Sequence, residues 1–105
     1  MAHNNNLSLK LINRGEEGEV LMKGRLDSVT SPEAEEILLE LVDRFNRLIL
    51  NMSDLQYLSS MGLRVLKQMY MRARKNDGEL VLKNVNKLTM EVFEMTGFAG
   101  ILTII

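Results

Sequence analysis

The sequence predicts a single α/β domain built on a mixed, largely parallel sheet. Short apolar segments alternate with amphipathic helical segments, a two-strand pattern precedes the first helix, and the chain has 105 residues. Strands that alternate with helices are joined by right-handed crossovers and lie parallel in one sheet. A chain of this length forms one domain around one core. The expected order is strand, strand, helix, strand, helix, strand, helix, strand.

The chain opens on a polar segment, residues 1–6, that has no apolar periodicity. Such a segment carries no core residues, so we expect a disordered leader, in part a cloning remnant. The folded domain is expected over residues 7–105.

A β-hairpin is predicted next. Leu7, Leu9 and Leu11 alternate with other side chains, which is the period of a half-buried strand. Residues 15–18 (GEEG) are expected to form the turn, and residues 19–23 the second strand.

The first helix is expected to begin near Pro32, because proline suits the first turn of a helix. Thr30 and Glu33 fit a capping box, in which each side chain binds the other residue's backbone N–H. The apolar residues that follow recur at helical spacing and form one stripe: Ala34, Ile37, Leu38, Leu41 and Phe45.

A buried central strand is predicted over residues 47–52, followed by a connecting loop over residues 53–58. The second helix is expected to begin between Ser59 and Met61, to run to Lys75, and to end at the turn 76–78. Its apolar stripe contains Gly62, Val65, Leu66, Met69 and Ala73.

The third unit repeats this pattern. Residues 79–83 form the predicted strand, and Asn86 is expected to cap a helix that ends at residues 96–97. The apolar stripe of this helix is Leu88, Val92 and Met95. Residues 101–105 are expected to form a short final strand.

Composition excludes several classes of function. The absence of Cys excludes disulfides, thiolate zinc sites and thiol nucleophiles. The single histidine, His3, falls in the expected leader, so the fold has no imidazole for catalysis or metal binding, and we expect neither an enzyme nor a cofactor. A net charge of -1 lacks the basic excess that nucleic acid binding requires. No apolar run is long enough to span a membrane, and we expect a cytoplasmic protein.

The most unusual local feature is the sequence Leu-Ser-Ser-Met-Gly-Leu at residues 58–63. On one interpretation, Ser59 or Ser60 caps the second helix and Gly62 allows close packing against the sheet. On the other, one serine is phosphorylated, which adds a charge of about -1.5 to -2 without disrupting the fold. The residues themselves favour the first interpretation.

The second helix also has an uneven charge, with five basic residues and no acidic ones between residues 61 and 75. Bases late in a helix interact favourably with the helix dipole, and this explanation is the simpler one. The alternative is a docking surface for an acidic partner.

Four segments, taken in order, resemble a known family. They are residues 24–27, 48–63, 78–85 and 92–98. Their order and spacing are similar to the STAS domain of bacterial anti-sigma factor antagonists, and the resemblance covers residues 7–105. The family usually has a C-terminal helix after the last strand. This sequence stops at Ile105, so we expect that helix to be absent and the neighbouring sheet to be bare.

Two family motifs can be matched residue by residue. The motif G-x-L-D-x-x-T corresponds to Gly24, Leu26, Asp27 and Thr30. The motif D-S-S/A-G-L at the phosphoacceptor loop corresponds to Ser60, Gly62 and Leu63, with Ser60 at the phosphoacceptor position. Two positions depart from the second motif: Ser59 replaces an Asp, and Met61 replaces a small residue.

The resemblance implies a regulatory module that binds an anti-sigma serine kinase and is switched off by phosphorylation of Ser60. ATP and magnesium would belong to the kinase. Partner contacts are expected at Asp27, Ser59, Met61, Gly62 and Arg64. The alternative is a non-phosphorylated STAS scaffold subunit of a stress-signalling complex or a lipid transporter, which the two departures favour. A small hydrolase or transferase is disfavoured because the fold contains no histidine. No oligomeric state is predicted.

Overall fold

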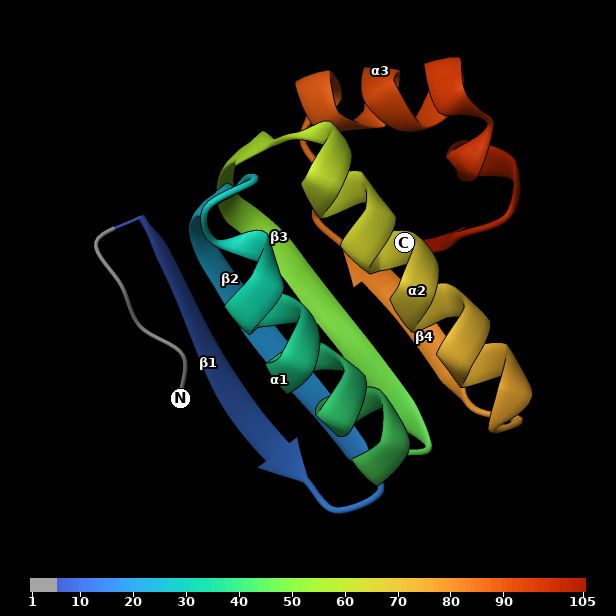
Figure 1. The fold of residues 1–105 in the computed structure, drawn as a ribbon. Coiled ribbons are helices and arrows are strands. Elements are labelled where there is room, and N and C mark those ends of the chain that lie inside the picture. The colour runs from blue at the N-terminus through green and yellow to red at the C-terminus, as the bar shows by residue number, and fades with distance from the viewer. Residues whose placement is uncertain (1–5) are drawn as a thin grey trace.

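The computed structural model describes residues 6–105 and has the predicted order of elements (Figure 1). The strands are β1 (Leu7–Arg14), β2 (Glu17–Leu26), β3 (Arg47–Leu58), β4 (Glu79–Lys83) and β5 (Thr103–Ile104). The helices are α1 (Ser31–Arg44), α2 (Ser60–Lys75) and α3 (Lys87–Thr96), followed by a 3-10 turn over Phe98–Gly100. The expected leader lies outside the described residues, except for Asn6.

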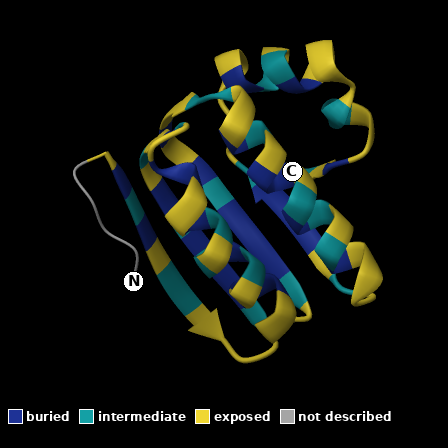
Figure 2. Cartoon of the chain, viewed as in Figure 1, coloured by how far each residue is buried: buried dark blue, intermediate teal, exposed yellow. Residues whose placement is uncertain are grey.

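The sheet is mixed, as predicted, with the strands in the order β1-β2-β3-β4-β5. The β1–β2 pair is antiparallel, and the remaining pairs are parallel. Helices α1 and α2 lie side by side on one face of the sheet, and α3 lies across the end where the parallel strands terminate (Figure 1). The buried residues gather between the sheet and α1 and α2 (Figure 2).

The hairpin turn is tighter than predicted. Arg14 pairs with Glu17, so only Gly15 and Glu16 connect the two strands. Gly15 has a φ of 85°, and its N–H donates to the Asn13 side chain at 2.9 Å. Because glycine reaches this φ without steric cost, the two strands continue almost to the turn.

The predicted capping box at the start of α1 is wrong. The Thr30 side chain makes no helix-cap hydrogen bond. Its hydroxyl instead donates to the Arg25 carbonyl at 2.8 Å and accepts from the Asp27 N–H at 3.0 Å. The hydroxyl is thus already engaged by the end of β2, and Glu33 is left exposed.

The loop predicted over residues 53–58 is also wrong, because β3 continues to Leu58. The extension pairs with the end of β2, and the register shifts twice, between Leu21 and Lys23 and again between Gly24 and Arg25. Such bulges break the strict alternation of buried and exposed residues. The sequence pattern past residue 52 therefore did not indicate a strand.

The third helix is correctly placed, but its predicted apolar stripe is wrong. Leu88 is 67% exposed and Met95 is 86% exposed, whereas Thr89 and Phe93 are buried. The cap at Asn86 sets this orientation, since its side chain accepts from Thr89 N–H at 2.8 Å and donates to the Leu55 carbonyl at 3.0 Å. Leu88 and Met95 therefore remain on the outside of the molecule, and Phe93 is the apolar side chain of α3 that enters the core.

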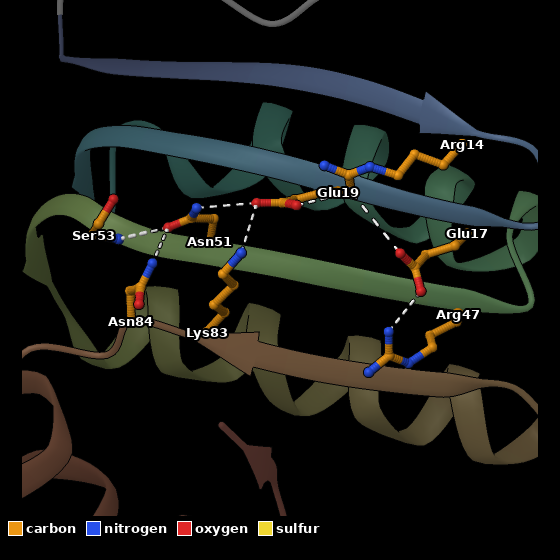
Figure 3. A network of polar contacts seen from close by, with 8 residues as sticks. All are labelled: Arg14, Glu17, Glu19, Arg47, Asn51, Ser53, Lys83 and Asn84. Carbon is orange, nitrogen blue, oxygen red and sulfur yellow. Dashed lines mark hydrogen bonds and ion pairs between the residues drawn. The ribbon is translucent and has the colours of Figure 1, made fainter.

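The face of the sheet opposite α1 and α2 carries a network of polar contacts (Figure 3). Arg14, Glu17, Arg47 and Glu79 occupy paired positions on four adjacent strands and alternate in charge. Arg47 Nη1 lies 2.6 Å from Glu17 Oε1. Opposite charges on neighbouring strands attract, so this row stabilises the strand register.

Glu19 lies at the centre of this face and is buried. Its carboxylate accepts from Asn51 Nδ2 at 3.0 Å and from Arg14 Nη1 at 2.8 Å, and Lys83 Nζ is 3.8 Å away. The hydrogen bond from Asn51 is the main cause of a lowered pKa of Glu19, and the bond from Arg14 adds to it. The carboxylate is thus stabilised in its charged form.

Glu19→Gln is expected to lower the free energy of unfolding by about 1 kcal/mol at pH 7, because the neutral amide makes weaker bonds to Arg14. The folded pKa of Glu19 lies below its unfolded value of about 4.3, so this contribution is present at neutral pH and is lost as the pH falls through the folded pKa. Urea unfolding at pH 7 and pH 3 measures the change. Glu36→Gln, at an exposed position on α1, is the control. A deficit of equal size at both pH values would contradict this role.

Candidate functional site

The candidate site lies where β2 and β3 end and α2 begins. The Ser59 N–H donates to the Leu26 carbonyl at 3.0 Å, which joins the end of β2 to the start of α2. This contact brings the two family motifs together, because Asp27 directly follows Leu26 and Ser60 directly follows Ser59. The site is therefore built from two segments that lie far apart in the sequence.

The two serines have different roles in the fold. Ser59 is the N-cap of α2, and its hydroxyl oxygen accepts from the Gly62 N–H at 3.2 Å. Ser60 is the first helical residue and is exposed, and no hydrogen bond holds its hydroxyl within residues 6–105. Ser59 is thus committed to the backbone, whereas Ser60 is accessible to a modifying enzyme.

Gly62 is required by a close approach of the helix to the sheet. A Cβ atom at this position would lie 2.5 Å from the Leu26 carbonyl oxygen and 2.7 Å from Leu58 Cδ1. A backbone atom cannot move aside as the end of a flexible side chain can, so only glycine fits without a shift of α2. The close-packing interpretation of Gly62 is confirmed.

Asp27 organises the turn between β2 and α1. Its Oδ1 accepts from the N–H groups of Thr30 and Val29, each at 3.0 Å, and its Oδ2 lies 3.4 Å from Arg25 Nε. The Thr30 backbone N–H is the largest cause of the lowered pKa of Asp27. This carboxylate shapes the backbone beside Ser60, and within residues 6–105 it makes no hydrogen bond to Ser60.

Exposed apolar side chains accompany this end of the molecule. Val29 lies in the turn after β2, Tyr57 near the end of β3, Met61 in the first turn of α2 and Leu88 in the first turn of α3. The Arg25 guanidinium lies 4.2 Å from the centre of the Tyr57 ring, a cation–π contact that fixes the ring. Apolar surface rimmed by charged residues is typical of protein-binding sites.

Two of the predicted contact residues, Met61 and Arg64, line a pocket between α1 and α2 toward their N-terminal ends. Met61 is 40% exposed, in agreement with its expected place on the surface. Met71 is also exposed, whereas Met69 is buried in the core.

The basic residues of α2 are only partly explained by the helix dipole. Arg72, Arg74 and Lys75 lie in the last turn, where a dipole favours cations. Arg64 lies near the first turn and Lys67 in the middle, and both are exposed. The dipole does not account for these two.

Three exposed apolar residues were not predicted as contact residues: Val29, Tyr57 and Leu88. The sequence placed Tyr57 in a predicted loop and Leu88 in the apolar stripe of the third helix, and neither pattern by itself indicates a binding surface. Val29 sits between the matched motif positions Asp27 and Thr30, and an apolar residue inside a polar turn was an available signal.

No helix within residues 6–105 is long and apolar enough to cross a membrane.

Comparison with known proteins identifies what this chain is similar to. Residues 12–105 match the family model described as the STAS domain. The protein BtrV of Bordetella bronchiseptica, provisionally named an anti-sigma factor antagonist, is 36% identical over 81 residues, which are 76% of this chain and 70% of BtrV. The anti-sigma-B factor antagonist of Bacillus subtilis is 28% identical over 86 residues, 82% of this chain and 79% of that protein.

The fold is also similar to solved structures. The structure of the Bacillus cell fate determinant SpoIIAA in its phosphorylated form superposes with a TM-score of 0.72 and 17% identity, covering 94% of this chain and 90% of SpoIIAA. This similarity supports the α/β fold described above.

Proposed function

The chain belongs to the STAS domain family, and on this premise we propose that it is an anti-sigma factor antagonist that binds an anti-sigma serine kinase and is switched off by phosphorylation of Ser60. The observation that carries the proposal is the division between the serines. Ser59 is held as the helix cap, and Ser60 is exposed beside it.

The chemistry asks little of this chain. The γ-phosphoryl group passes from ATP to Ser60 Oγ, ADP leaves, and the hydroxyl proton goes to a base of the kinase. What the chain supplies is an exposed hydroxyl on a rigid support. The Ser59 cap and the contact of Gly62 with Leu26 provide that support.

The surroundings of Ser60 support partner binding. Met61 beside it and Leu88 on α3 expose apolar area that a partner can bury. Asp27 contributes by holding the turn after β2 in place. A phosphate with a charge of about -1.5 to -2 on this surface must lose its hydration when a partner docks, which weakens binding.

Phosphorylation is tested by incubating the purified chain with the kinase that co-purifies from its own cells and with ATP and magnesium. Mass spectrometry is expected to place one phosphate on Ser60, and Ser60→Ala is expected to abolish it. Ser59→Asn is the matched control, because asparagine also caps helices and phosphorylation should persist.

Two results would refute the proposal. One is a phosphate on Ser59. The other is a kinase that binds the chain but adds no phosphate, which would favour a non-phosphorylated scaffold subunit. Ser60→Asp is expected to weaken kinase binding with little change in melting temperature, because the cap at Ser59 is retained.

A further inference from the structure

A small pocket lies between α1 and α2 toward their N-terminal ends, and Met61, the neighbour of Ser60 in the sequence, lines it. Its volume is about 220 Å³. Glu35 of α1 and Arg64 of α2 contribute opposite charges to its lining, and Met61 contributes an apolar side chain. Pockets that hold cofactors or similar ligands start at about 300 Å³, so this one suits a single protein side chain.

Arg64 is one of the two charged residues of this lining, and it has no charged partner in the part of the chain that the structure describes. Within residues 6–105 no ion pair or hydrogen bond engages its side chain. Arg72, two turns further along the same helix, shows the contrast, since its Nη1 lies 2.7 Å from Asp43 Oδ2. The Arg64 guanidinium is therefore available to a new anion.

Ser60 and Arg64 stand four residues apart on α2, so they are neighbours on one face of the helix. Long side chains on a helix lean toward its N-terminus, which directs Arg64 back toward Ser60. Helix α2 contains no acidic residue that would compete for this guanidinium. Of the nearby acids on other elements, Asp27 is engaged by Thr30, Val29 and Arg25, and Glu35 lies across the pocket.

We propose that Arg64 binds the phosphate on Ser60 and leaves the wall of the pocket to do so. This inference rests on the proposed phosphorylation of Ser60. A guanidinium presents paired N–H donors that match two phosphate oxygens. Before the modification, Arg64 is an unpaired charge on the surface of α2. After the modification, it is the residue that binds the phosphate.

The movement of Arg64 alters the pocket as well as the phosphate. Before phosphorylation the pocket contains one cation and one anion, Arg64 and Glu35. After it, Glu35 remains as the charged group of the lining, and the space left by the arginine side chain is open. A partner side chain that contacts Arg64 in the first arrangement loses that contact in the second, so phosphorylation acts on two parts of the binding surface together.

The test uses the full chain with phosphoserine installed at position 60 by genetic encoding, so that no kinase is required. Phosphorus NMR follows the second pKa of the phosphate against pH. A free phosphoserine has a value of about 6. The N-terminus of α2 also lowers this value, and we expect Arg64 to lower it by about a further 0.5, so that Arg64→Gln raises it by about 0.5. Lys67→Gln, on the same face one turn further, is the control and should leave the value unchanged.

Equal pKa values in the unsubstituted chain and in Arg64→Gln would overturn the proposal. A shift of the same size in Lys67→Gln and Arg64→Gln would also overturn it, because it would indicate a diffuse basic field. The side-chain Nε–H signal of Arg64 should move when position 60 carries a phosphate. Failure of a kinase to modify Ser60 would refute the proposed function and would leave this measurement unaffected.

Discussion

Alanine at position 62 is expected to lower the free energy of unfolding by about 2 kcal/mol. The added Cβ would meet the Leu26 carbonyl oxygen at 2.5 Å and the side chain of Leu58 at 2.7 Å. Overpacking of this kind costs about 1 to 3 kcal/mol, and the better helix propensity of alanine offsets at most about 1 kcal/mol. Urea unfolding of the Gly62→Ala chain at pH 7 measures the loss.

Gly100→Ala is the matched control, because apart from the adjoining chain nothing lies within 4 Å of the position its Cβ would occupy. Its stability should change by less than about 0.5 kcal/mol. If Gly62→Ala unfolds at the same urea concentration as the unsubstituted chain, α2 does not pack against the Leu26 carbonyl as closely as the structure indicates. The rigid support proposed for Ser60 would then need another explanation.

The order of elements followed from the sequence because periodicity reports which side of an element is buried. The stripe of α2 lies where it was predicted, and of the two serines predicted as possible caps, Ser59 is the one that caps the helix. The end of β3 was not predictable in this way. Its bulges bring two residues against one on β2, so the sequence loses the period by which a strand is recognised.

The third helix shows a second reason for failure. Its apolar residues have helical spacing, and spacing alone cannot say whether the stripe meets the core or another protein. The structure places Leu88 and Met95 outside. Because the predicted stripe placed Leu88 and Met95 in the core, both side chains were left out of the predicted binding surface.

The candidate site was predictable to the extent that it depends on local sequence. The segment 58–63 indicated a helix start with a glycine at a close contact, and the structure has both. The prediction that Asp27 lies beside the segment 58–63 depended on the family resemblance, because no local sequence pattern links residues so far apart. Whether Arg64 has an ion-pair partner depends on where the acidic residues of neighbouring elements lie. Only the three-dimensional arrangement shows their positions.

Phe93→Ala is expected to have the largest effect on stability among the substitutions considered, about 3 to 5 kcal/mol. Phe93 is fully buried and is the residue by which α3 joins the core cluster, with the partly buried Met90 packed against it. Its loss leaves a cavity where α3 meets the rest of the domain. Thermal and urea unfolding at pH 7 measure the change.

Leu88→Ala provides the comparison on the same helix. At 67% exposure it should alter stability by less than about 0.5 kcal/mol, because little apolar area returns to water. It should instead weaken kinase binding about fivefold, since truncating an exposed apolar contact costs on the order of 1 kcal/mol. The opposite pattern, a stable Phe93→Ala and an unfolded Leu88→Ala, would restore the stripe that the sequence predicted and would remove α3 from the binding surface.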